Sequence, residues 1–144
     1  MTWLGFSGAL FGALTLAVAC SSDDDKDPVQ CKPTPAFDLT VRAVAGSVPA
    51  DTLIHVKYGG GNETYKVNSG NPDEKVVLCE NLEDDAGAVS AIHCKVWTQS
   101  TATVTVTTAS FPTVKHDYDA ETDGDGCFKT KPIEIVLGDQ DAGT

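Results

Sequence analysis

Acidic residues alternate with other residues between positions 117 and 126, in the run DYDAETDGDG. Oxygen ligands at every second position, followed by glycine, are typical of the start of a calcium-binding loop, because Ca²⁺ is held by about six to eight oxygens. The candidate ligands are Asp119, Glu121, Asp123 and Asp125. The bidentate glutamate that closes such a loop is missing, since its position holds Thr130. We therefore favour a polar strand end that leads into an Asp-Gly turn, with calcium binding as the alternative.

The cysteines are the second set of residues whose side chains could carry chemistry. Apart from Cys20, which ends an apolar leader, four cysteines remain. An even number in an exported chain predicts two disulfides, and three connectivities are open. We favour Cys79–Cys94, which would join neighbouring strands, with Cys31–Cys127, which would join the two ends of the domain. A zinc site is disfavoured because the sequence contains no C-x₂-C pair.

Three histidines fall on three separate predicted strands. Alternation with apolar neighbours places His55 and His93 toward solvent, and it places His116 partly inside. A catalytic or metal cluster would need them to converge on one face. We expect a structural role for each of them.

Aromatic side chains offer a different kind of site. Trp97, Tyr58, Tyr65 and Tyr118 would either form a platform for a sugar or a peptide or pack in the core. The sequence contains no G-x-S-x-G elbow, no H-E-x-x-H motif and no phosphate-binding loop. We therefore expect a protein that is not an enzyme and that carries no cofactor, calcium at the acidic loop excepted.

Short strands must position all of these residues, because apolar side chains recur with a period of two from Phe37 onward. β-branched residues dominate the runs, and Gly, Asn, Asp and Pro separate them. The expected strands lie near residues 37–43, 53–58, 65–67, 76–79, 92–96, 102–107, 114–118 and 133–137. The predicted fold class is all-β: an antiparallel β-sandwich of seven to eight strands over residues 37–138, transthyretin-like or immunoglobulin-like, with two disulfides.

One stretch carries a family resemblance. The run TVTVTTASFPTV at 103–114 is similar to a hairpin of carboxypeptidase regulatory-like domains, which are transthyretin-like sandwiches, and it departs from them at Ser110, where the family usually has Gly. The segments 39–42 and 52–56 look like the first two strands of that family. The resemblance implies an accessory or binding module without a catalytic centre of its own.

The N-terminal leader predicts the compartment. Residues 3–20 are nearly all apolar or small, and the segment LAVAC at 16–20 resembles the lipobox of bacterial lipoproteins. In that family the cysteine is acylated and becomes the mature N-terminus, which makes Cys20 the expected lipid attachment site and residues 1–19 the signal peptide. A cleaved secretory signal and an uncleaved membrane anchor are the alternatives.

The segment after the leader is an acidic, Pro-rich tether at 20–36, and residues 139–144 are expected to be a flexible tail. By resemblance to lipoprotein sorting in enteric bacteria, Ser21 favours the outer membrane. The run SDDDKD at 22–27 resembles an export tag for the cell surface, and a plain solvated tether is the alternative.

Charge and composition complete the functional expectation. The 144-residue chain has a formal net charge of −11, which disfavours a nucleic-acid partner. We expect a lipid-anchored protein of the bacterial envelope with a non-catalytic binding or structural domain and an unidentified protein or glycan partner. The alternatives are a calcium-dependent adhesion or carbohydrate-binding module and an accessory subunit of a secreted hydrolase.

Overall fold

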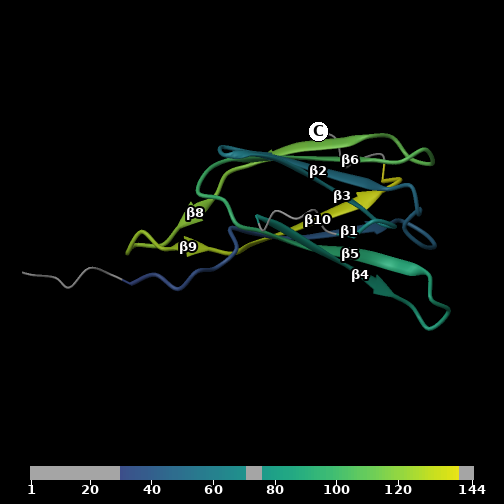
Figure 1. Cartoon of the computed structure of the whole chain (residues 1–144), viewed down its shortest axis with the longest axis horizontal. Helices are drawn as coiled ribbons and strands as arrows, with labels where there is room; N and C mark the ends of the chain where they lie inside the picture. The colour runs from purple at the N-terminus through teal and green to yellow at the C-terminus, as the bar shows by residue number, and fades with distance from the viewer. Residues whose placement is uncertain (1–29, 71–75, 140–144) are drawn as a thin grey trace, which may run out of the picture.

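The computed structural model describes residues 30–70 and 76–139, and all of its regular elements are β-strands. Eight strands form two four-stranded sheets, and two further strands form a short ribbon. The two sheets lie face to face, and the ribbon projects from one end (Figure 1). The predicted all-β sandwich with two disulfides is therefore confirmed. Within the described ranges no helix is long and apolar enough to cross a membrane.

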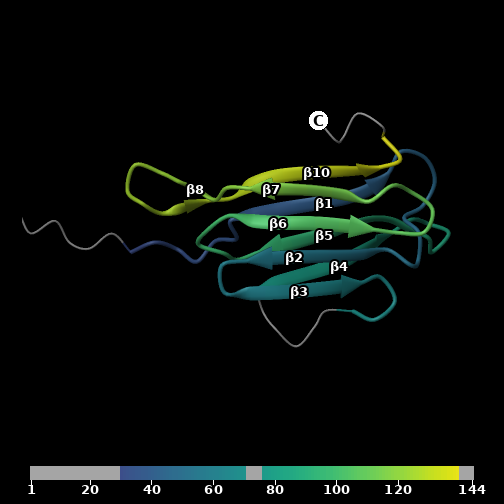
Figure 2. The same ribbon diagram turned by 90° about the horizontal axis from the view of Figure 1, so that it is seen from above.

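Sheet A contains, in spatial order, β10 (Lys131–Leu137), β1 (Phe37–Ala43), β5 (Val89–Val96) and β4 (Val77–Glu83). Sheet B contains β3 (Gly61–Lys66), β2 (Leu53–Tyr58), β6 (Ala102–Thr107) and β7 (Val114–Tyr118). The ribbon pairs β8 (Glu121–Thr122) with β9 (Phe128–Lys129). Figure 2 looks onto sheet B and shows its four strands side by side.

The core lies between the two sheets, because each strand turns its apolar side chains inward at every second position. In sheet A, Leu39 of β1 and Ile92 of β5 are fully buried. In sheet B, Ile54 of β2 and Val106 of β6 are fully buried and are register partners across the β2–β6 pair. The period-two pattern of the sequence therefore marks the inner faces of both sheets.

One pairing departs from the expected antiparallel arrangement. β1 and β10 run parallel, with Leu39 opposite Ile133 and Val41 opposite Ile135. A parallel pair needs a long crossover connection, and here the rest of the domain provides it. The first and last strands of the sandwich are therefore neighbours that run in the same direction.

Both favoured disulfides are formed. Cys79 and Cys94 are directly opposite each other on β4 and β5, and their side chains are buried between the sheets. Cys31 and Cys127 are 96 residues apart in sequence and join the segment before β1 to the turn before β9. The prediction that these bridges connect neighbouring strands and the two ends of the domain is confirmed.

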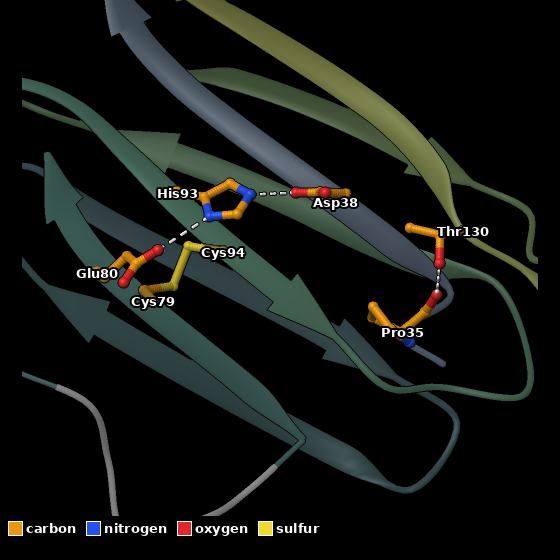
Figure 3. Close-up of polar contacts among 7 residues, drawn as sticks. All are labelled: Pro35, Asp38, Cys79, Glu80, His93, Cys94 and Thr130. Carbon is orange, nitrogen blue, oxygen red and sulfur yellow. Dashed lines mark hydrogen bonds and ion pairs between the residues drawn. A yellow bond between two sulfur atoms is a disulfide. The ribbon is translucent and has the colours of Figure 1, made fainter. Parts of the chain in front are cut away.

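The segment before β1 packs along the segment before β10. The Thr34 hydroxyl donates to the carbonyl of Phe128 at 3.0 Å, and the Thr130 hydroxyl donates to the carbonyl of Pro35 at 2.8 Å (Figure 3). The backbone N–H of Lys131 donates to the carbonyl of Ala36 at 2.9 Å. The described end of the predicted tether, residues 30–36, is therefore held against the folded domain.

Candidate functional site

A groove of about 640 Å³ lies at the end of the sandwich from which the ribbon projects. Four segments of the chain line it: the end of β2 and its turn at 58–60, the loop at 97–100 that follows β5, and the segments at 31–34 and 126–128, which a disulfide links. Side chains from distant positions therefore meet in one hollow. The aromatic members of its lining are Tyr58, Trp97 and Phe128.

Tyr58 is the last residue of β2, and a buried carboxylate orients it. Its hydroxyl donates to Glu63 Oε1 at 2.7 Å, and Glu63 Oε2 accepts the backbone N–H of Val77 at 3.0 Å. Glu63 is only 4% exposed although it carries a carboxyl group. Because both of its oxygens are satisfied, this side chain can occupy the gap between β3 and the start of β4. The position of the Tyr58 ring is thus fixed from inside the core.

The β2–β3 turn approaches the loop after β5 closely, and glycine permits that approach. A Cβ on Gly59 would lie 2.8 Å from Ser100 Oγ. Ser100 in turn is held by its loop, since its backbone N–H donates to Thr98 Oγ1 at 3.3 Å. A side chain at position 59 would have to displace the Ser100 hydroxyl from this position.

Trp97 is a wall shared by two hollows. It directly follows β5, and its backbone N–H donates to the carbonyl of Val76 at 2.8 Å. Its half-buried side chain lines the groove, and it also lines a hollow of about 410 Å³ on the outer face of sheet A, beside Leu78 and Lys95. The surface accessible to a ligand therefore continues from the end of the sandwich onto the face of sheet A.

The lining of the groove is aromatic and polar with little charge. Hydroxyl and amide groups come from Thr34, Thr98, Gln99 and Ser100, and the one charged side chain in the described lining is that of Lys32. No Asp or Glu belongs to it, although the chain contains 21 acidic residues. Concave sites of this type hold organic ligands by apolar contact and by a few directed hydrogen bonds.

A second polar cluster lies on the outer face of sheet A. The His93 ring of β5 lies between two carboxylates, with Nε2 against Asp38 Oδ1 of β1 and Nδ1 at 3.2 Å from Glu80 Oε1 of β4 (Figure 3). The hydrogen bond to Glu80 raises the pKa of His93 most and the contact with Asp38 raises it further, while partial burial of the ring lowers it. The cluster links three adjacent strands of the sheet.

The histidines do not form a joint site. The two ring nitrogens of His93 are directed at Glu80 and Asp38, on opposite sides of the ring, and not at another histidine. His55 lies on the outer face of sheet B, where its Nδ1 is 2.8 Å from Thr64 Oγ1. His116 is half-buried on β7 beside Tyr118, with ring centroids 6.0 Å apart. The predicted directions of the three side chains agree with the structure.

The four candidate calcium ligands are not brought together. Asp119 Oδ1 accepts the hydroxyl of Thr101 at 2.7 Å, and Glu121 Oε1 is 2.7 Å from Lys131 Nζ. The hydrogen bond and the charge of Lys131 lower the pKa of Glu121. These two carboxylates therefore already have partners in the structure.

The other two candidates form the turn of the ribbon. Asp123 Oδ1 accepts the backbone N–H groups of Asp125 and Cys127 at 3.0 and 2.9 Å, and Gly126 adopts a φ of 81°. This is the Asp-Gly turn that the sequence favours. Across residues 30–70 and 76–139, no three His, Cys, Asp or Glu side chains are arranged to hold a metal ion.

The predicted aromatic platform is only partly present. Tyr58 and Trp97 meet at the groove, but Tyr65 is 3% exposed and donates its hydroxyl to Asn81 Oδ1 at 2.8 Å. Tyr118 packs against Phe37 with ring centroids 6.2 Å apart. Tyr65 therefore belongs to the core, and the partly buried Tyr118 packs against it. The predicted lipid attachment site, Cys20, lies outside the described residues.

Sequence reasoning missed Phe128 and the polar part of the groove. Phe128 lies in a two-residue strand, which has no periodic pattern to reveal it. The disulfide at Cys127 is the one signal in the sequence that places this residue near the start of the domain. Comparison with known proteins identifies no relative: no family model matches the chain, and no curated protein or solved structure is similar to it.

Proposed function

We propose that the chain is an exported lipoprotein of the bacterial envelope. Its lipid is attached at Cys20, and its sandwich is a non-catalytic binding or envelope-structural domain held at the membrane surface. By resemblance to lipoprotein sorting in enteric bacteria, Ser21 favours the outer membrane. The acidic segment that follows is a tether or a surface-export signal.

The pairing of the cysteines is the observation that supports this proposal most directly. The chain has five cysteines, and four of them form the two disulfides. Disulfides form and persist in oxidising compartments outside the cytoplasm. These two bonds leave the fifth cysteine, Cys20, which is at the position where the lipobox resemblance needs a free thiol.

The chemistry of the groove supports binding over catalysis. Its aromatic rings, hydroxyls and amide can hold a ligand, while its described lining contains no carboxylate, histidine or free thiol to act as an acid, a base or an activated nucleophile. We therefore assign the groove as the binding surface of the domain.

The intact mass of the protein purified from its membrane fraction tests the anchor. The expected mass is that of a chain that begins at Cys20 and carries acyl groups. Without reduction, the mass should be lower by four hydrogens, because two disulfides are formed. A Cys20→Ala variant should leave the membrane fraction, because acyl chains supply the membrane affinity. A full-length mass without acyl groups, or membrane retention of the variant, would contradict the proposal.

A further inference from the structure

We propose that the groove binds a neutral oligosaccharide, with one sugar ring stacked on Trp97 and its neighbours placed by Tyr58 and Phe128. This inference rests on the proposed function, in which the sandwich is a binding domain, and it specifies the chemical class of the ligand.

The combination of groups in the groove matches the surface of a sugar. A pyranose ring has a face of C–H groups that packs on an aromatic ring, and hydroxyls around its edge that need hydrogen-bond partners. Trp97, Tyr58 and Phe128 provide apolar rings, while Gln99 and Ser100 provide an amide and a hydroxyl beside them. Buried aromatic surface supplies the affinity in such sites, and the few directed polar groups supply the specificity.

Charge indicates that the ligand is neutral. A cationic ligand would be recognised by carboxylates: in the described lining the groove has none, and the one carboxylate of the adjoining hollow, Glu80, is already in contact with His93. An anionic polymer would be repelled over long range by a chain of formal net charge −11, against which Lys32 in the groove and Lys95 in the hollow give little attraction. A ligand without charge avoids both penalties.

The shape of the surface indicates a chain of sugars and not a single ring. Trp97 borders both the groove and the hollow beside Leu78 and Lys95 on sheet A. A ligand that contacts Trp97 from both the groove and the hollow must be longer than one sugar ring. A peptide that adds a strand would need a free sheet edge, whereas the groove is lined mainly by turn and loop residues, with Tyr58 at the end of β2 and Phe128 in the ribbon.

Tryptophan fluorescence tests the proposal at the residue that carries it. The two tryptophans of the sequence are Trp3 and Trp97, so a chain that begins at Cys20 contains Trp97 alone. The acylated protein, purified in a detergent without a sugar headgroup, is titrated with cellohexaose, maltohexaose, mannohexaose and chitohexaose. We expect a saturable change in Trp97 emission with at least one of them, and a dissociation constant that calorimetry reproduces.

Matched variants then locate the binding. Trp97→Ala should weaken binding more than tenfold in calorimetry, and Trp97→Phe should retain part of the affinity because a ring remains. Gln99→Ala, which removes no core side chain, should weaken binding with the fold intact. The control is Phe111→Ala, since Phe111 is half-buried at the opposite end of the sandwich, against the position of Gly138, and should leave the affinity unchanged.

Three outcomes would overturn the inference: no binding by any of the four sugars, unchanged affinity in both Trp97→Ala and Gln99→Ala, or binding of polygalacturonate or a Pro-rich peptide in preference to the neutral sugars. An acylated chain that binds none of the sugars would remove the ligand class and leave the lipoprotein proposal intact. The mass measurement and the titration therefore fail independently.

Discussion

Sheet A and sheet B differ in where polar side chains are buried. In sheet A the charged contacts lie on the outer face, where His93 bridges Asp38 and Glu80 and where Arg42 pairs with Glu134. Two polar residues are buried in the described core, and both belong to the other half of the sandwich: Glu63 lies on β3 of sheet B, and Thr52 directly precedes β2. Exposed charges exchange partners with water at little cost, whereas buried polar groups depend on the partners that the fold provides.

The sheets also differ in how their strands are connected. In sheet B, β2–β3 and β6–β7 are pairs of consecutive strands, and β2–β6 is the one long-range pairing. In sheet A, both β1–β5 and β1–β10 join strands that are far apart in the sequence. Long-range pairings carry a larger loop-closure entropy, and both disulfides lie in or beside sheet A. The Cys31–Cys127 bond thus shortens the long connection between β1 and β10, whereas Cys79–Cys94 joins the consecutive strands β4 and β5.

Breaking the long-range disulfide should have the largest effect. The Cys31→Ser, Cys127→Ser double variant opens a loop that spans 96 residues, and we expect it to lower the free energy of unfolding by about 4–5 kcal/mol in the chain-entropy account. Urea unfolding without reductant measures this difference. A loss below about 1 kcal/mol would show that the hydrogen bonds at 34–36 hold the ends together without the bridge.

Removing the buried carboxylate of sheet B should come next. Glu63→Ala leaves the buried N–H of Val77 without its acceptor, so we expect a loss of about 1–3 kcal/mol in urea unfolding. Glu63→Gln is the matched control, because its amide oxygen can accept from Val77 and its NH₂ group can donate to the Tyr58 oxygen. Equal losses in the two variants would contradict this explanation.

Thr52 offers a gain of stability in the same sheet. Its hydroxyl is buried, with the residue 0% exposed, and has no hydrogen-bond partner among the residues that the structure describes. Thr52→Val keeps the shape and removes the unpaired group, and it should raise the free energy of unfolding by about 1 kcal/mol. Thr105→Val, on the outer face of sheet B, should change stability by less than about 0.5 kcal/mol. A loss of stability in Thr52→Val would show that the hydroxyl has a role that its surroundings do not reveal.

The smallest effect should come from the outer face of sheet A and should depend on pH. The pKa of His93 is raised above its ordinary value of 6.5 in the folded protein, so the folded state favours protonated His93. Its contribution is complete below pH 6.5 and is lost as the pH rises through the raised value. We expect His93→Gln to remove this decline and His55→Gln to preserve it, as measured by unfolding at a series of pH values. Parallel curves for wild type and His93→Gln would contradict the assignment.

The sequence was sufficient for the eight strands of the two sheets, because alternation is a local pattern, and the even number of cysteines after Cys20 favoured two disulfides. Alternation identifies the inner faces, and it places Cys94 on the core side of β5 and His93 on the other side. The same parity could have located Glu63, since it shares the face of Tyr65 on β3, but the charge of its side chain suggests exposure.

The contacts between distant strands were not accessible in this way. A strand has the same apolar pattern whether its neighbour runs parallel or antiparallel, so the β1–β10 pair could not be inferred. The partners of His93 are 13 and 55 residues away, and the groove assembles four separate segments. Such sites depend on register and on chain path, which the pattern within a single strand does not contain.

The Cys31–Cys127 bridge has a mechanical consequence. A pulling force that enters at the N-terminal end and leaves at the C-terminal end passes through this covalent bond, so the 96-residue loop that it closes bears no tension. Without the bridge, an unravelled loop of this size would lengthen the molecule by roughly 300 Å, at 3.3–3.6 Å per residue. With the bridge, only the chain after Cys127, which holds β9 and β10, can be drawn out, and β10 must then slide along the parallel β1. The groove residues at 58–60 and 97–100 lie within the closed loop and bear no tension, whereas Phe128 lies on the pulled segment.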